Sequence, residues 1–402
     1  MSYNYNVQKR LDNVRSLDIL EVNKKYIIDF VKDQAAQNNS IARQVKYASI
    51  MSKIMQLINY DFKKASKNQI KDICSKINNS NLSDWTKHDY KLSIKVLYRF
   101  LNDLDNEEYP NEVKWIKLKK KNSKRKLPRD LLTIEDAKEI ANNTNNPRDR
   151  CLCLMLYESG TRISELLELK NRDFNFEKGE GKYIHVTLPD NGKTGARTIL
   201  LVASYPAILN WKKYHPRKND KQAYFFCGLN SNNKGERLQY RHVNDLLKEA
   251  GEKAGIDKPL NPHHFRHSRA TELAKKLTEA QLCNFMGWVI GSREAATYVH
   301  LSGRDTDSQI LEMYGLKQNE EEEIERFKPI NCLRCETIND PAAKFCSNCG
   351  LGLDEKSLLE YDKQKEEAID LGMILKKAKD NDQIKEMLRP LLREILQVDD
   401  KK

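Results

Sequence analysis

The chain has 402 residues, of which 70 are lysine or arginine and 58 are aspartate or glutamate, so its formal net charge is +12. This length allows two or three domains that each bury a core, and the positive excess favours a polyanion as partner. Because no apolar run is long enough to span a bilayer and no signal-peptide core begins the chain, we expect a cytoplasmic protein without a membrane partner.

Residues 1–113 have apolar side chains spaced three and four apart, as at Ile27, Phe30 and Val31. This is the period of amphipathic helices. Stretches rich in asparagine and serine interrupt the pattern, so we predict a bundle of four or five helices. The residues alone leave open whether this bundle binds DNA or another protein.

The segment 114–129 is crowded with cations and has a proline near its end, which is typical of a linker between domains. A basic strap of this kind can cross phosphates and release their counterions. The alternative is an ordinary solvated basic surface. The candidate DNA contacts in this linker are Lys119, Lys120, Lys121, Lys124, Arg125 and Lys126.

Residues 130–316 are predicted to form a mixed domain. A capping-box-like sequence from Thr133 to Asp136 begins a helix, and helices continue to Leu169. Alternating β-formers at 182–188 and 197–202 flank turn residues, which predicts an antiparallel hairpin with Lys193 at or beside its tip. Helices resume at Tyr240, so the expected fold class is mainly α with a small antiparallel sheet (α+β).

The last part of the chain is predicted to hold an acidic linker (317–328), a metal module (329–354) and a helical tail (355–402). Two C-x-x-C pairs have the spacing of a zinc ribbon with a structural Zn²⁺ ion. They are Cys332, Cys335, Cys346 and Cys349. The partner of this module stays open between DNA, another protein and a second protomer, and the tail packs either within the chain or between protomers.

The other five cysteines are scattered, and most lie within apolar patterns. In a cytoplasmic protein such cysteines are normally reduced and buried as packing residues. They are Cys74, Cys151, Cys153, Cys227 and Cys283.

A series of cations and polar donors in the mixed domain ends in one tyrosine, in the order Arg162, Lys193, His263, Arg266, Trp288 and Tyr298. A phosphodiester repels nucleophiles, so a site that attacks it must neutralise two oxygens, protonate the leaving alkoxide and present its own nucleophile. Arginines, histidine, indole and lysine supply the first two functions, and tyrosine supplies the third. This chemistry requires no catalytic metal.

Four local sequences resemble the signature boxes of the tyrosine recombinase (phage integrase) family. The sequence from Gly160 to Leu166 resembles its G-x-R-x-S-E-L box, and that from Pro262 to Thr271 its P-H-x-x-R-H-S/T-x-A-T box. Met286-Gly287-Trp288 resembles the L-G-H/W step, and Tyr298 lies in a sequence similar to the nucleophile box. The resemblance covers roughly residues 130 to 315.

This resemblance implies that Tyr298 is the nucleophile and that Arg162 and Arg266 bridge the scissile phosphate. His263 and Trp288 would donate to its oxygens, His263 alternatively accepting the tyrosine proton, and Lys193 would protonate the leaving 5′ oxygen. Glu165, one helical turn after Arg162, would orient that guanidinium.

Several of these assignments have competitors in the sequence. Tyr298 lies ten residues after Trp288, about one residue more than is usual in the family, and Tyr314 is the alternative nucleophile. Lys182 is the alternative to Lys193. His264 competes with His263 by position, and His267 is interpreted as a packing or supporting residue.

The resemblance implies a site-specific recombinase or integrase that cleaves and rejoins double-stranded DNA through a 3′-phosphotyrosine intermediate, without ATP. Four protomers would act on two paired DNA sites, associated with the nucleoid, and residues 1–113 would clamp the DNA face opposite the catalytic domain. One alternative is a type IB topoisomerase, which relaxes supercoils as a monomer. Another is a DNA-binding regulator of the same fold whose catalysis has been lost.

Overall fold

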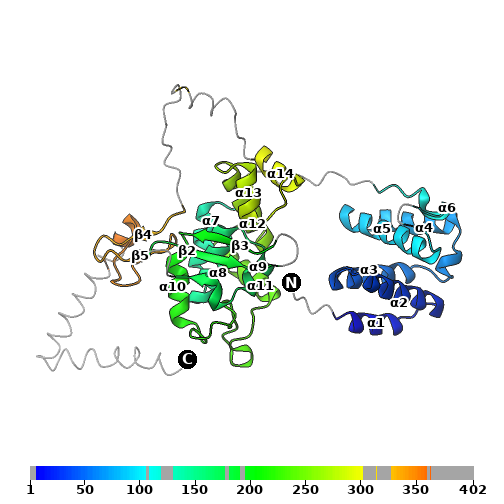
Figure 1. Cartoon of the computed structure of the whole chain (residues 1–402), viewed down its shortest axis with the longest axis horizontal. Helices are drawn as coiled ribbons and strands as arrows, with labels where there is room; N and C mark the ends of the chain where they lie inside the picture. The colour runs from blue at the N-terminus through cyan, green and yellow to red at the C-terminus, as the bar shows by residue number, and fades with distance from the viewer. Residues whose placement is uncertain are drawn as a thin grey trace, which may run out of the picture. The chain divides into compact units, whose positions relative to one another are not determined.

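The computed structural model describes residues 6–105, 108–118, 130–176, 181–190, 195–301, 314, 327–359 and 363. The chain divides into two compact units, Met1–Lys126 and Leu127–Lys402 (Figure 1). The division lies within the segment 114–129 that was predicted as a linker. The six candidate DNA contacts of that segment lie outside the described residues.

The described part of the first unit is helical, as its periodicity predicts. Its helices are α1 (Val7–Arg15), α2 (Glu21–Ala36), α3 (Ile41–Met55), α4 (Lys67–Asn79), α5 (Asp84–Leu101) and the single turn α6 (Asn111–Lys114), with a 3₁₀ turn η1 at Phe62–Lys64. Serine side chains cap three of them, at Ser40, Ser66 and Ser83. Such caps satisfy amide groups that have no partner within the helix.

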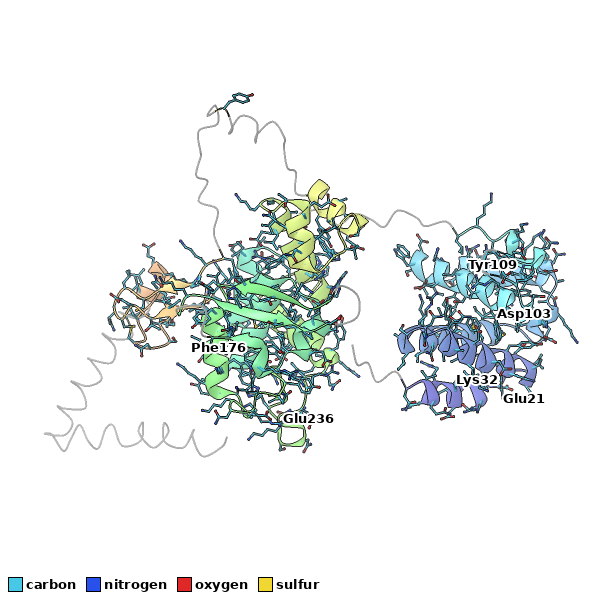
Figure 2. The ribbon with its side chains drawn as sticks, viewed as in Figure 1. Glu21, Lys32, Asp103, Tyr109, Phe176 and Glu236 are labelled. Atoms are coloured by element: carbon cyan, nitrogen blue, oxygen red, sulfur yellow. The ribbon has the colours of Figure 1, made fainter. Side chains whose placement is uncertain are left out.

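Aromatic rings fill the core of this unit. Phe30 meets Tyr47 edge to face with 5.3 Å between ring centroids, and the Tyr98 hydroxyl donates to the Phe62 carbonyl at 2.8 Å. Figure 2 labels Tyr109, whose ring lies 4.0 Å from the Lys95 ammonium. The unit therefore has its own packed interior, which is what an independently folding domain requires.

The second unit places helices around a three-stranded sheet (Figure 1). Its helices are α7 (Ile134–Asn142), α8 (Pro147–Ser159), α9 (Ile163–Glu168), α10 (Tyr205–Tyr214), α11 (Tyr240–Lys253), α12 (Pro262–Ala274), α13 (Glu279–Met286) and α14 (Arg293–Leu301), with 3₁₀ turns at Asn171–Asp173 and Ser231–Asn233. The capping box predicted at Thr133 and Asp136 is present at the start of α7. The predicted class, mainly α with a small antiparallel sheet, is confirmed.

The sheet has the strand order β1 (Phe174–Asn175), β2 (Ile184–Leu188), β3 (Arg197–Leu201), with both pairs antiparallel. Ile184 pairs with Leu201 and Leu188 with Arg197, so the predicted hairpin is confirmed. Its tip, 191–194, lies outside the described residues, and with it the candidate acid Lys193.

Helix α8 is buried along almost its whole length, and its middle, 151–157, is apolar on every side except for the Tyr157 hydroxyl. Its one buried carboxylate near the end, Glu158, accepts backbone N–H bonds at 2.7 to 2.8 Å from Val202, Ala203 and Ser204. This ties the end of α8 to the end of β3. The segment that follows α8 carries Arg162, so the bonds of Glu158 help to fix the position of that arginine.

The cysteine-rich segment forms a small ribbon, β4 (Ile330–Asn331) paired with β5 (Ile338–Asn339), and lies against the second unit. Arg150 of α8 donates twice to the Asp340 carboxylate, at 2.7 and 3.0 Å, and the Phe327 ring lies 5.1 Å from Tyr157. Ala342 is buried in the same apolar cluster as α8. Nothing in the sequence indicated this contact.

Most of the predicted acidic linker and helical tail lies outside the described residues. The five scattered cysteines are unpaired and buried, as expected. Among the residues that the structure describes, no helix has the length and apolar character needed to cross a bilayer.

Candidate active site

Arg162 caps the start of α9, directly after the turn that ends α8. That turn needs Gly160, whose φ of +55° is a left-handed conformation. The Arg162 guanidinium donates to the Glu165 carboxylate at 2.9 Å and to the Gly287 carbonyl at 3.1 Å. Its side chain remains 31% exposed, so part of the guanidinium faces solvent.

Arg266 lies one helical turn into α12 and is 4% exposed. It donates to the carbonyls of Gly160 (2.8 Å) and Met286 (2.7 Å). Burial, followed by the positive charge of Arg162, lowers the pKa of Arg266 to about 10. The guanidinium is therefore still charged at neutral pH, in a place where only part of its charge is balanced by acids.

Glu165 is a buried carboxylate shared by two arginines. Arg162 binds one of its oxygens, while Arg197 of β3 donates to both, at 3.2 and 2.8 Å. Burial acts to raise the pKa of Glu165, but the bonds and charge of Arg197 and the bonds of Arg162 leave it below the usual value. The carboxylate is therefore charged and contacts the Arg162 guanidinium.

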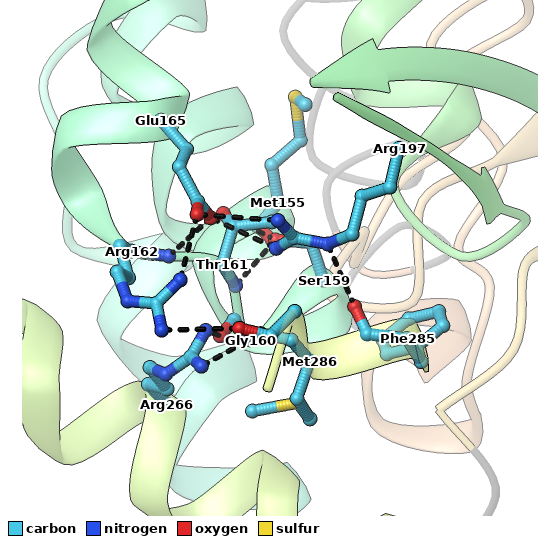
Figure 3. A network of polar contacts seen from close by, with 11 residues as sticks. Met155, Ser159, Gly160, Thr161, Arg162, Glu165, Arg197, Arg266, Phe285 and Met286 are labelled. Atoms are coloured by element: carbon cyan, nitrogen blue, oxygen red, sulfur yellow. Dashed lines mark hydrogen bonds and ion pairs between the residues drawn. The ribbon is translucent and has the colours of Figure 1, made fainter. Parts of the chain in front are cut away.

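Three successive carbonyls at the end of α13 each accept a hydrogen bond from a different arginine (Figure 3). Arg197 donates to Phe285 at 3.1 Å, Arg266 to Met286 at 2.7 Å and Arg162 to Gly287 at 3.1 Å. The last carbonyls of a helix have no partner within it and attract positive charge. The end of α13 thus fixes three cations side by side.

Gly287 is required at this point for two reasons. Its φ is +63°, and a Cβ added there would lie 2.5 Å from the Arg197 guanidinium. Any larger residue would therefore strain the backbone and displace an arginine.

Tyr298 of α14 is 5% exposed and lies near Arg266. Its ring stacks on Trp288, with 5.1 Å between centroids and 10° between planes, and the Arg266 guanidinium lies 5.3 Å from the Trp288 ring. Its hydroxyl contacts Nδ1 of His267. Burial raises the pKa of Tyr298 to about 12, with Arg266 acting in the opposite direction, so the phenol is protonated at neutral pH.

The three histidines of α12 have different environments. His263, in the first turn, is exposed, and its ring centroid lies 4.2 Å from that of His267. His264 is fully buried, with Nε2 2.5 Å from the Asp130 carbonyl oxygen. His264 therefore serves packing, and His263 is the member of this pair that solvent and a ligand can reach.

The structure thus brings together Arg162, Glu165, Arg266, Trp288 and Tyr298, with His263 at the rim. The two alternatives of the sequence lie elsewhere, since Tyr314 is 75% exposed and Lys182 is exposed.

The sequence analysis missed Arg197 and gave His267 only a minor role. Arg197 stands at the start of a strand and carried no motif, because its partners are 32 and 88 positions away. His267 was interpreted as a packing or supporting residue. Its position one turn after His263 was the available signal that it shares the same helix face.

The four clustered cysteines fit a tetrahedral metal site. Their Sγ atoms all lie within 4.8 Å of one another, with 3.5 Å between Cys332 and Cys349 and 3.5 Å between Cys335 and Cys346. Four thiolates about 2.3 Å from one ion would have similar separations. Hydrogen bonds with Thr337 lower the pKa of Cys335 to about 5, whereas the pKa of Cys349 is raised to about 11, so the thiols of the cluster differ in how readily they lose a proton.

Part of this chain is similar to known proteins. Residues 130–304 match the model of the phage integrase family. The tyrosine recombinase XerA of Pyrococcus furiosus is 36% identical over 156 residues, which cover 38% of this chain and 51% of the relative. Transposase A from transposon Tn554 of Staphylococcus aureus is 27% identical over 222 residues, covering 52% and 58%. The chain spans about half the length of the curated relatives it matches.

Solved structures show the same fold at low identity. A XerH site-specific recombinase bound to a palindromic difH substrate has a TM-score of 0.53 and 19% identity, covering 78% of this chain and 94% of that one. A lambda integrase dimer bound to a COC′ core site has a TM-score of 0.56 and 14% identity, covering 70% and 78%. Residues 130–304, which carry the arginine cluster and the stacked tyrosine, therefore match the phage integrase family model and have the fold of these recombinase structures.

Proposed function

We propose that this protein is a site-specific DNA recombinase that cleaves and rejoins duplex DNA through a 3′-phosphotyrosine intermediate. The observation that carries the proposal is that Trp288 contacts both a buried, charged arginine and a buried tyrosine. A charged guanidinium kept beside a protonated phenol suits a phosphate that arrives next to a nucleophile.

The proposed reaction assigns a separate task to each group. The Tyr298 oxygen attacks the scissile phosphorus, the P–O5′ bond breaks, and the phosphate stays joined to the protein. Arg162 and Arg266 neutralise the non-bridging oxygens, because each guanidinium has five N–H donors and the carbonyl and carboxylate contacts described above use two of them. His263 donates at the rim, and Lys193 protonates the leaving oxygen.

The phosphotyrosine link conserves the energy of the diester, so rejoining needs no ATP. Attack by the new 5′ hydroxyl reverses the first step and releases the tyrosine. Because cations of the protein stabilise the charge, the chemistry also needs no catalytic metal. We therefore infer a strand transferase whose cleavage proceeds in the presence of EDTA.

The partners we propose are double-stranded DNA and further copies of the same chain. The net charge of +12 favours a polyanion, and the basic segment 114–129 joins the two units. A lambda integrase tetramer bound to a Holliday junction has the same fold as this chain, with a TM-score of 0.55. By this analogy the first unit clamps DNA, four protomers act on two sites, and the work takes place on cytoplasmic, nucleoid-associated DNA.

A covalent-adduct assay tests the function. Full-length protein is incubated in EDTA with nicked duplex fragments drawn from the host genome and its mobile elements, and the DNA joined to protein is recovered and sequenced. We expect adducts at a small number of related sites, with Tyr298 as the linked residue by peptide mass spectrometry. Efficient relaxation of any supercoiled plasmid without site preference would instead indicate a topoisomerase, and the absence of adducts would contradict strand cleavage.

We further propose that the four cysteines hold a structural Zn²⁺ ion. A closed site of four thiolates leaves no position for substrate, so its effect is on stability. Ordering of the ribbon also holds Asp340 against Arg150, and this ion pair is largely buried, with side chains 12% and 21% exposed. The metal would therefore stabilise the second unit as well as the ribbon.

Removal of this metal is expected to lower the melting temperature of the second unit. Because Asp340 lies between the two cysteine pairs, a disordered ribbon would leave the Arg150 guanidinium with fewer partners. Calorimetry with and without a strong chelator, together with zinc quantification, measures the effect. Asp340→Asn should reproduce part of the loss with zinc still bound, whereas Glu355→Gln, an exposed change outside the contact, is the control. Equal melting curves would contradict the coupling.

A further inference from the structure

We propose that His267, rather than His263, is the catalytic base that takes the phenolic proton of Tyr298 as the tyrosine attacks. The inference deepens the proposed function and rests on it. His267 thereby gains a chemical role beyond the packing or supporting part that its place in the sequence suggested. This assignment also leaves His263 available for the phosphate.

The geometry puts His267 on the reacting atom. His267 lies one residue after Arg266 on α12, and its Nδ1 contacts the Tyr298 hydroxyl oxygen. The two rings are tilted by 32° with 5.7 Å between centroids. A base must lie within hydrogen-bond reach of the proton that it removes, and His267 satisfies this condition without any movement of the helix.

The phenol needs such a base. Its pKa of about 12 means that very little phenolate exists at neutral pH. An imidazole nitrogen that accepts the hydroxyl hydrogen bond is unprotonated, and so it is ready to receive the proton. Histidine is the side chain whose ordinary pKa lies closest to the working pH, which makes proton transfer in both directions efficient.

In this step one bond forms, one bond breaks and two protons are transferred. The Tyr298 oxygen forms the bond to phosphorus while its proton moves to Nδ1 of His267, and the electron pair of the breaking P–O5′ bond goes to the leaving oxygen. That oxygen takes a proton from the acid on the opposite side, for which Lys193 is proposed. When the strand is rejoined, the imidazolium returns its proton to the tyrosine oxygen.

His263 is better placed for a different task. It is exposed at the first turn of α12, and the ring that it approaches is that of His267, 4.2 Å away. The first turn of a helix presents unpaired N–H groups and favours an anion. His263 is therefore suited to the phosphate, and its contact also holds the imidazole of His267 in place.

The charged or titratable side chains described around this pair include His263, Arg266 and Glu294, while Arg162 and Glu165 act on Arg266. His263 and Arg266 lie on the same helix, and Glu294 lies one turn before Tyr298 on α14. Arg266 lowers the pKa of Tyr298 and Glu294 raises it, so the charges partly cancel. On the other helices packed against α12, Glu158 bonds with 202–204, Cys283 with Val289 and Glu249 with Lys253.

The test measures single-turnover formation of the covalent adduct by full-length protein from pH 5.5 to 9. The substrate is a nicked duplex carrying a site mapped as described above. Wild type should accelerate as the imidazole loses its proton and then level off. His267→Gln, which keeps a hydrogen-bonding group but is not a base, should be slower by about 100-fold or more at pH 7. Its rate should rise with pH throughout the range, because hydroxide must then remove the proton.

A second substrate has sulfur in place of the bridging 5′ oxygen. It distinguishes removal of the tyrosine proton from protonation of the leaving group. A thiolate leaves without a proton, so this DNA should restore cleavage by Lys193→Ala but not by His267→Gln. Two results would overturn the proposal. One is that the sulfur-substituted DNA restores the cleavage rate of His267→Gln. The other is that His267→Gln cleaves ordinary DNA at a rate within threefold of wild type and with the same pH profile. If His267→Gln does not fold, His267→Asn places an amide near the position of Nδ1 and serves instead.

These outcomes are distinct from failure of the proposed function. If wild type forms no adduct with either substrate, the recombinase assignment fails. If wild type forms the adduct and His267→Gln equals it, only the role of His267 fails. Melting temperature and DNA affinity of each variant, measured on the same preparations, show whether a slow rate has a structural cause.

Discussion

Replacement of Tyr298 by phenylalanine is expected to reduce covalent adduct formation below detection while DNA binding is retained. The change removes one oxygen and keeps the ring, so the stack on Trp288 at 5.1 Å is preserved. The side chain is 5% exposed, and the lost contact to His267 should cost only about 1 kcal/mol of the free energy of unfolding. Loss of the nucleophile, by contrast, removes the reaction path.

Tyr314→Phe is the matched control, because it makes the same chemical change at a side chain that is 75% exposed. We expect this variant to form the adduct at the rate of wild type. Gel separation of protein joined to labelled DNA measures both variants, and a binding titration with the same DNA confirms that each still binds it. Adduct that persists in Tyr298→Phe and disappears in Tyr314→Phe would reassign the nucleophile.

Replacement of Arg197 by alanine is expected to damage both the fold and the reaction. Arg197 and Glu165 are buried partners, with side chains 8% and 3% exposed, so removal of one leaves an incompletely paired carboxylate. Such losses cost about 3–5 kcal/mol of the free energy of unfolding. The Phe285 carbonyl would also lose its donor.

The effect on the reaction should follow from Arg162. With Arg197 absent, the Glu165 carboxylate is free to turn toward Arg162 and to draw its guanidinium away from the phosphate. We expect adduct formation to fall by about 100-fold, as is usual when a group that stabilises developing charge is misplaced. Urea unfolding and single-turnover cleavage measure the two effects.

Two further variants show whether Arg197 acts through its charge or through the geometry of its guanidinium. Arg197→Lys keeps the charge but lacks the planar fork that binds two oxygens and a carbonyl, so it should recover stability more than rate. Arg172→Ala removes an arginine that is 53% exposed and should leave both quantities close to wild type. Wild-type stability in Arg197→Ala would show that the buried contact contributes nothing.

Much of the fold could be predicted because its signals are local. The capping box at Thr133, the strands on either side of 189–196 and the helical period of the first unit each depend on residues within a few positions of one another. Helix α10 was not predicted. It begins at Tyr205, directly after a strand, and a proline in its first turn was the local sign that was available.

In the candidate site too, the residues that lie in local motifs could be predicted, whereas the contacts between distant residues could not. Arg162, Arg266 and Tyr298 lie in motifs, since each motif reflects the turn or helix that presents the side chain. The positions of these residues relative to one another depend on the end of α13, where the Phe285, Met286 and Gly287 carbonyls meet donors from β3, α12 and α9. No spacing in the sequence encodes that convergence, and for the same reason the contact between His267 and Tyr298, 31 positions apart, was not anticipated.

The contact between the cysteine ribbon and α8 has a consequence for how the protein is made. A ribosome that has released residues 1–316 has already produced all six candidate catalytic residues. It has not yet produced Asp340, which binds Arg150, or Ala342, which fills part of the same apolar core as α8. During translation residues 130–304 therefore lack these two contacts until the ribbon has been made, and we expect a chain that ends before residue 329 to be less stable than the full-length chain.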